Sequence, residues 1–247
     1  MATAPRGEAV SGRNLTYAML DHVGRDIVTG VYDSRPFPTE AELAQAHAVS
    51  RSVTREAVKM LTAKGLLTAR PRKGTSVQPP TSWNLFDTDV LRWLLERKFS
   101  LGLLRHFSEL RVAIEPAAAA LGAVAADADA IAAIRAGFAR MEAAEAGEDD
   151  TLEADIAFHI AVLNSSANPF YMQFRDLVAT ALQTSIRFTN RFTGRTADME
   201  SHRGVMEAIE RGDPEGARAL MAEIIGGVMV LIEAAEAEPA SPPTLND

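Results

Sequence analysis

The segment "TEAELAQAHAVSRSVTREAVKMLTAKGLLTARPRKGTSV", residues 39–77, contains the boundary signals of two short helices and a hairpin. Thr39 is followed three residues later by Glu42, which is the spacing of a capping box at the start of a helix. Ser50 is the next N-cap residue, and Gly65 ends the helix that Ser50 starts. The segment therefore predicts two helices joined by a short turn.

Two short strands follow these helices and enclose a cationic turn at residues 71–74. An apolar stripe at helical spacing over residues 15–29 precedes them. A helix, two further helices joined by a turn, and a small hairpin form the element order of a winged helix-turn-helix. We therefore expect this fold over residues 15–78.

The helix expected at residues 50–64 has two different faces. Its inward stripe is expected to contain Val53, Ala57, Met60 and Leu61. On another face, Arg51, Arg55 and Lys59 are spaced four residues apart. A helix that reads duplex DNA needs cations and short polar groups on the face that enters the major groove. The same spacing also fits an ordinary solvated face, but the order of the elements favours DNA.

Two arginines near the start of this helix, Arg51 and Arg55, are the expected contacts to base edges. Further contacts, mainly to phosphates, are expected from Ser50, Ser52, Arg72 and Lys73, the last two at the hairpin tip.

Charge is divided unevenly along the chain, whose formal net charge is −8. Residues 1–80 contain 11 Lys and Arg against 7 Asp and Glu, whereas the remainder contains 14 against 26. This asymmetry predicts a basic module that meets a polyanion, joined to an acidic module with another task. The acidic total is no objection, because only the presented face meets phosphates.

The quoted segment resembles the DNA-binding domain of the GntR family of bacterial transcriptional regulators. The family pattern runs Leu-Pro-Ser-Glu, Glu-Leu, Val-Ser-Arg-x-x-x-Arg-Glu-Ala, and a Gly-Leu wing that ends in Gly-Thr. The resemblance implies that Arg51 and Arg55 read bases in operator DNA, supported by Thr39, Glu40 and wing residues near Gly74. Where the family often has a DNA-contacting arginine, this chain has Ala41, which affects the expected operator sequence.

The Pro-rich stretch at residues 78–84 is the expected domain boundary. We expect a mainly α chain: a disordered segment 1–14, the winged domain 15–78, a linker 79–99, a helical bundle 100–236 and a disordered tail 237–247. Expected helices span residues 86–98, 101–125, 127–146, 149–165, 169–192, 196–211 and 214–236. There is no cysteine and no apolar run long enough for a bilayer, so a cytoplasmic protein without membrane contact is expected.

Two Asp-x-x-x-His pairs occur in the helical half: Asp155 with His159, and Asp198 with His202. At this spacing both side chains project from one helix face and can chelate a divalent ion such as zinc, manganese or nickel. Alternatively, Asp198 caps a helix and the histidines are polar core residues whose hydrogen bonds are satisfied.

The stretches "FSELRVAIEPAAAALGA", "DIAFHIAVLNSSANP" and "SHRGVMEAIERGDPEGARALM" are similar to the FCD effector domain of the FadR-like branch of the family. This resemblance covers residues 100–235 and implies a metal held by Asp155, His159 and His202. The family's fourth ligand position, 22 residues after His202, is occupied here by Ile224. An effector or water could complete the site, Asp198 could join it, or it could be empty.

In the FCD pattern Arg111 faces the effector cavity, where its guanidinium suits a carboxylate. Arg187 and Asn190 could line the same cavity. The stretch "WNLFDTDVLRWLLER" is similar to the linker of sugar-acid regulators, the galactonate repressors among them, and this implies a sugar acid.

The sequence therefore predicts a homodimeric DNA-binding regulator, acting as a repressor on a pseudopalindromic operator and controlled by a small organic or sugar acid. Two alternatives stay open at this point: a metal-dependent enzyme in the helical half, and a DNA-binding protein without an effector. Against the enzyme, no nucleophile with a paired base is found.

Overall fold

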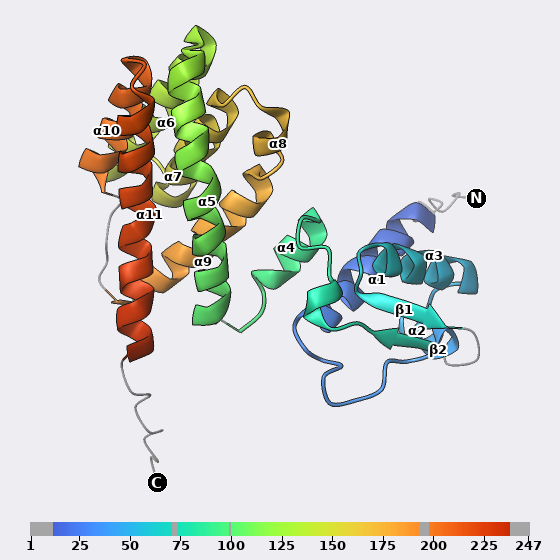
Figure 1. Cartoon of the computed structure of the whole chain (residues 1–247). Helices are drawn as coiled ribbons and strands as arrows, with labels where there is room; N and C mark the ends of the chain where they lie inside the picture. The colour runs from blue at the N-terminus through green and yellow to red at the C-terminus, as the bar shows by residue number, and fades with distance from the viewer. Residues whose placement is uncertain (1–11, 71–73, 99, 193–197, 238–247) are drawn as a thin grey trace, which may run out of the picture. The chain divides into compact units, whose positions relative to one another are not determined.

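Helices dominate the chain in the computed structural model, which describes residues 12–70, 74–98, 100–192 and 198–237 (Figure 1). The chain divides into two units, Met1–Lys98 and Phe99–Asp247, each with its own set of buried apolar side chains. The mainly α fold class expected from the sequence is confirmed.

The first unit is the expected winged helix-turn-helix. It contains α1 (Gly12–Val28), α2 (Glu40–Ala46), α3 (Arg51–Ala63), β1 (Leu67–Arg70), β2 (Gly74–Val77), the short 3-10 helix η1 (Pro80–Ser82) and α4 (Thr88–Leu94). The two strands are antiparallel, with Leu67 opposite Val77 and Arg70 opposite Gly74. Because α1 begins at Gly12, the structured part starts inside the segment 1–14 that was expected to be disordered.

The core of the first unit lies between α1, α2 and α3, where Leu20, Val23, Leu43 and Leu61 are buried. The inward face of α3 differs from the expected stripe: Val53 and Met60 are only half-buried, and Thr54 and Val58 are buried in addition to Ala57 and Leu61. The Thr54 hydroxyl tolerates burial because it donates to the carbonyl oxygen of Ser50 at 3.2 Å.

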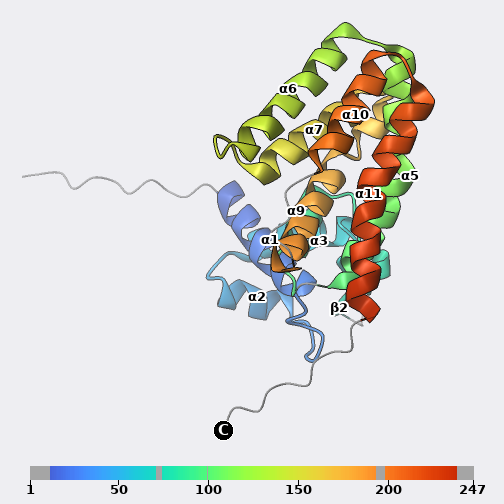
Figure 2. The same ribbon diagram turned by 90° about the vertical axis from the view of Figure 1, so that its left-hand side faces the viewer.

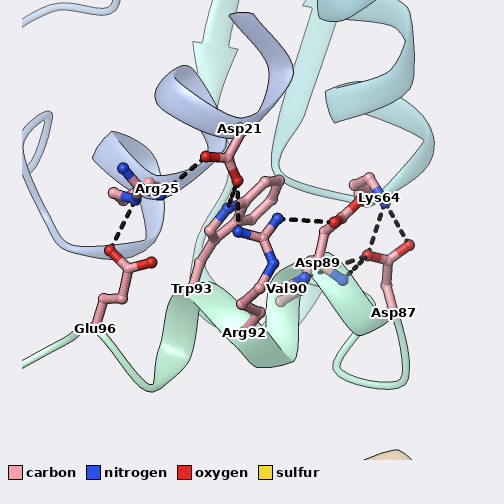
Figure 3. A network of polar contacts seen from close by, with 9 residues as sticks. All are labelled: Asp21, Arg25, Lys64, Asp87, Asp89, Val90, Arg92, Trp93 and Glu96. Atoms are coloured by element: carbon pink, nitrogen blue, oxygen red, sulfur yellow. Dashed lines mark hydrogen bonds and ion pairs between the residues drawn. The ribbon is translucent and has the colours of Figure 1, made fainter. Parts of the chain in front are cut away.

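Helix α4 is an integral part of the first unit, not a linker between units. Its Trp93 is fully buried against α1, and the indole Nε1 donates to Oδ1 of Asp21 at 2.9 Å (Figure 3). Lys64, the C-cap residue of α3, forms ion pairs with Asp87 at 2.7 Å and Asp89 at 2.8 Å. The division therefore falls after Lys98 and not at the Pro-rich residues 78–84.

The second unit is an all-helical bundle. Its helices are α5 (Leu101–Ala125), α6 (Ala128–Glu145), α7 (Thr151–Ser165), α8 (Pro169–Met172), α9 (Arg175–Phe192), α10 (Met199–Glu210) and α11 (Pro214–Ala237). The long helices α5 and α11 lie side by side, and α6 pairs with α7 (Figures 1 and 2).

Two expected helices differ from those observed. The span 86–98 is reduced to α4, which ends at Leu94. The single helix expected at residues 169–192 is divided into α8 and α9. The division follows from tight turns after Pro169, in which Gln173 N–H donates to Phe170 and Phe174 N–H donates to Tyr171, while both Tyr171 and Phe174 pack on the core.

The interior of the second unit contains a larger apolar cluster built mainly from α6, α7, α10 and α11, and a smaller one between α5, α7 and α9. Helices α5 and α7 contribute to both clusters and also contribute buried polar side chains, which form the site described below. Among the described residues, no helix is long and apolar enough to cross a membrane.

Candidate functional site

Helix α3 presents the face that the sequence predicts for DNA. Arg51, Ser52, Arg55 and Lys59 are exposed, while the opposite side of the helix packs on the core. The side chain of Arg55 is 67% exposed, and its Nε lies 3.9 Å from Oε2 of Glu40. A single weak ion pair at the surface leaves this guanidinium able to exchange partners. The geometry is compatible with insertion of this face into a major groove.

Two of the proposed DNA-contacting residues have a role within the protein. Thr39 and Glu42 form the full capping box of α2: the Thr39 hydroxyl accepts from the Glu42 amide at 3.3 Å, and the Thr39 amide donates to Oε2 of Glu42 at 2.8 Å. Ser50 caps α3 by accepting from the Val53 amide at 3.3 Å. Their first effect is therefore to fix where α2 and α3 begin.

The hairpin of β1 and β2, which is the wing of the fold, is described only in part. Gly74 is exposed, has a φ of +79°, and opens β2. Arg72 and Lys73 lie outside the described residues, so their contacts to DNA stay predictions.

In the second unit, three potential metal ligands converge in the interior. Asp155 and His159 come from one face of α7, and His202 comes from α10. Nε2 of His202 lies 3.3 Å from Oδ1 of Asp155 and 3.4 Å from Nε2 of His159. One ligand atom from each residue falls within 4.8 Å of the others, and all three residues are buried. The structure therefore brings together the three ligands that the sequence predicted.

The other ring nitrogen of each histidine is held by an oxygen. Nδ1 of His159 lies 2.5 Å from Oε2 of Glu115, and Nδ1 of His202 lies 2.6 Å from the backbone oxygen of Asp198. Each of these oxygens can accept a hydrogen bond from a protonated Nδ1, and in neutral rings the Nε2 lone pairs then face Asp155 and each other.

The donor set fits a divalent ion. Oδ1 of Asp155 is buried and has no hydrogen-bond partner, which is unfavourable unless a cation or a proton satisfies it. One carboxylate and two imidazoles suit zinc, manganese or nickel.

Neither the family's fourth ligand position nor Asp198 supplies a further ligand side chain. Ile224 is partly buried and packs against the larger apolar cluster. Asp198 is the N-cap of α10, where its carboxylate accepts from the Ser201 amide at 3.2 Å and from the Ser201 hydroxyl at 2.8 Å. The capping interpretation of Asp198 is therefore confirmed, and three candidate ligands remain among the described residues.

The guanidinium of Arg111, which was expected to bind a carboxylate effector, already pairs with a carboxylate of the protein. The residue is only 2% exposed, and its Nε donates to Oε1 of Glu115 at 2.6 Å. One of its terminal nitrogens lies 3.5 Å from Nδ1 of His159. Arg111 thus adjoins the metal-ligand cluster, and an internal carboxylate already occupies part of its donor set. Arg187 and Asn190 belong to α9, but their side chains lie outside the described part of the chain.

Glu115 is the site residue that the sequence analysis missed. It is fully buried; burial alone would raise its pKa, but Arg111 and His159 lower that pKa to about 2. A signal was present in "ELRVAIEP", because an acid one turn after an arginine in an apolar stretch is expected to be paired when buried.

A winged-helix unit with an outward-facing basic helix, followed by an all-helical unit with a buried polar cluster, is the arrangement of a DNA-binding transcriptional regulator with a second domain. Residues 18–77 match the model described as bacterial regulatory proteins, gntR family, and residues 106–227 match the FCD domain. The chain belongs to the GntR family of bacterial regulatory proteins, in the group that carries an FCD domain.

Related proteins agree with this assignment. The galactonate operon transcriptional repressor of Escherichia coli is 34% identical over 209 residues, which cover 83% of this chain and 90% of the repressor. The HTH-type transcriptional regulator YieP of the same organism is 32% identical over 208 residues, with the same coverage of 83% and 90%. Together these matches show a transcriptional regulator and not an enzyme.

The solved structure of E. coli McbR/YncC has the same fold. It aligns over 90% of this chain and 98% of its own with a TM-score of 0.51 and 16% identity.

Proposed function

We propose that the protein represses transcription and that a small carboxylate effector, a sugar acid, bound in its second unit controls its affinity for operator DNA. The observation that carries the proposal is the buried polar cluster between apolar clusters, in which Oδ1 of Asp155 has no partner. Buried polar groups are normally satisfied, so an exception of this kind indicates a ligand or a metal. The sugar-acid class is supported by the galactonate repressor, which is 34% identical.

On the DNA side, a homodimer would place two copies of α3 in successive major grooves of a pseudopalindrome. Arg51 and Arg55 would contact base edges, and the exposed Ser52 would contact a phosphate or a base. Glu40 would orient Arg55 through the contact at 3.9 Å instead of touching DNA itself.

On the effector side, Asp155, His159 and His202 would hold one divalent ion. When bound, the ion would supply positive charge and coordination positions not filled by the protein, which suit the oxygens of a sugar acid. Arg111 would contribute its terminal nitrogens to the carboxylate, since Glu115 occupies its Nε. The effector can change the affinity for DNA only if it binds more tightly to one of two conformations of the protein, the one that binds DNA and the one that does not.

The proposal is tested by thermal-shift measurements with a panel of sugar acids and dicarboxylates, with and without a chelator. Each acid is matched with its neutral parent sugar as a control. We expect an aldonate to raise the melting temperature in the metal-loaded protein, the parent sugar to have no effect, and the chelator to remove the response.

Operator binding is then followed by fluorescence anisotropy on a duplex selected in vitro. An aldonate that stabilises the protein but leaves operator affinity unchanged contradicts control by the effector. If no acid in the panel stabilises the protein, the interpretation as a DNA-binding protein without an effector is favoured instead.

A further inference from the structure

We infer that Glu115 is a positioning residue of the metal site, and that its carboxylate fixes the ring tautomer in which His159 directs Nε2 toward Asp155 and His202. The inference rests on the proposed metal site, and it concerns a residue on α5, a helix that supplies none of the three ligands.

Both oxygens of the Glu115 carboxylate make hydrogen bonds. Oε1 accepts from Nε of Arg111 at 2.6 Å, and Oε2 lies 2.5 Å from Nδ1 of His159. An ionised carboxylate can only accept hydrogen bonds, so Nδ1 of His159 must hold the proton. In the neutral ring the lone pair then belongs to Nε2, the atom that lies 3.4 Å from Nε2 of His202.

The surroundings leave Glu115 little freedom. The residue is fully buried, and Arg111 lies one helical turn before it on the same face of α5. A buried carboxylate is stable only when it is paired, and here Arg111 supplies the pairing charge. Arg111 therefore holds the carboxylate in place, and the carboxylate holds the imidazole.

The two histidines are oriented by different means. His202 is fixed by the backbone oxygen of Asp198 at 2.6 Å, which no side-chain substitution removes. The short contact at Nδ1 of His159 is with a side chain, the Glu115 carboxylate at 2.5 Å, whereas the terminal nitrogen of Arg111 lies 3.5 Å away. A substitution at position 115 therefore changes the orientation of one ligand and leaves the other in place. Partners of this kind, which contact a ligand and not the metal, typically change metal affinity by about 10- to 100-fold.

The first test needs no metal. Long-range proton–nitrogen NMR of the metal-free wild-type protein distinguishes the two neutral tautomers of each histidine ring. We expect His159 to hold its proton on Nδ1 in the wild-type protein, and to lose this preference in Glu115→Gln, whose amide can either accept or donate. A wild-type His159 with its proton on Nε2 overturns the inference, whether or not the variant folds.

The second test measures zinc affinity by competition with a chromophoric chelator. We expect Glu115→Gln to bind zinc about 10- to 100-fold more weakly than wild type. The matched control is Glu109→Gln, the same substitution at an exposed position of the same helix, which should leave zinc affinity unchanged. Equal zinc affinities of wild type and folded Glu115→Gln contradict the inference.

The two hypotheses fail differently. If the wild-type protein binds no zinc, manganese or nickel, the proposed metal site is wrong. The tautomer of His159 then still shows whether Glu115 orients that ring. If the wild-type protein binds a metal and the tautomer or the variant's affinity is not as expected, the metal site stands and the role of Glu115 falls.

Discussion

Replacing Gly24 by alanine should disturb the packing of α4 on α1 and destabilise the first unit. An added Cβ at position 24 would lie 2.2, 2.4 and 2.6 Å from three ring carbons of Trp93. The ring is rigid and fully buried, so no flexible end can move aside. Since ordinary contact between carbons begins near 3.5 Å, the ring would have to move by roughly 1 Å. Such a movement would also break the bond of 2.9 Å between Nε1 and Asp21.

The magnitude follows from three effects. Overpacking of a core costs about 1–3 kcal/mol. Loss of a hydrogen bond to a charged group costs about 1.5–3 kcal/mol. Alanine is better than glycine inside a helix by about 1 kcal/mol, which offsets part of this loss. We therefore expect Gly24→Ala to lower the unfolding free energy of the first unit by about 1.5–5 kcal/mol, which lowers its melting temperature by roughly 6–40 °C.

The assay is calorimetry of the full chain, combined with tryptophan fluorescence to report on the Trp93 environment. The matched control is Gly102→Ala on α5, where the nearest atom to an added Cβ is Oγ of Ser100 at 3.7 Å, an ordinary contact. The control should leave the first unit unchanged. Equal melting temperatures and equal emission spectra for Gly24→Ala and wild type would refute the packing of Trp93 on α1.

Three further predictions concern single residues. Arg55→Ala should weaken binding to an in vitro selected operator by about 1–3 kcal/mol and relax base preference, as measured by anisotropy on point variants of the site; unchanged affinity would mean that this face does not read DNA. Burial alone would raise the pKa of Glu115, but Arg111 and His159 lower it from 4.5 to about 2. Above pH 4.5 the ionised carboxylate should therefore contribute about 3 kcal/mol to the free energy of unfolding. This contribution is lost as the pH falls toward 2. Urea unfolding from pH 6 to pH 2.5 should therefore show the stability difference between wild type and Glu115→Gln shrinking; a constant difference contradicts the pairing. Thr39→Ala should cost about 1 kcal/mol through loss of the α2 cap, whereas Thr39→Ser should be nearly neutral in the same unfolding measurement; equal losses would exclude the hydroxyl as the cause.

The winged helix could be predicted because its boundaries are encoded locally. Thr39 with Glu42, Ser50 and Gly65 each act within a few residues of their own position, and all of them function in the structure as expected. The inward face of α3 was harder to predict, since an apolar stripe is assigned by polarity alone. Thr54 can be buried because its hydroxyl donates to the carbonyl oxygen of Ser50, and a hydropathy pattern does not reveal this hydrogen bond.

Sequence spacing predicts a contact between two candidate site residues only when both lie on the same helix. The spacing of Asp155 and His159 is visible in the sequence, but their approach to His202 depends on how α7 packs on α10, and only the family resemblance supplied it. The contact between Glu115 and His159 joins residues 44 positions apart. Spacing cannot predict such a contact, because the identity of a partner across helices is set by packing.

The Pro-rich stretch before α4 shows why a composition signal for a boundary can be wrong. Its prolines lack amide protons, but both ends of the stretch are tied to the first unit: the Gln78 amide donates to the Leu66 oxygen at 2.9 Å, and the Asn84 amide donates to the Lys64 oxygen at 2.9 Å. Partial burial opposes the charged form of Lys64, yet hydrogen bonds to Asp87 and Asp89 raise its pKa, so these ion pairs persist at neutral pH. Because Lys64 is also the C-cap of α3, these ion pairs tie the start of α4 directly to the helix that carries Arg51 and Arg55 (Figure 3). The indole of Trp93 ties the same short helix to α1 through Asp21, so α4 is held by two helices of the first unit.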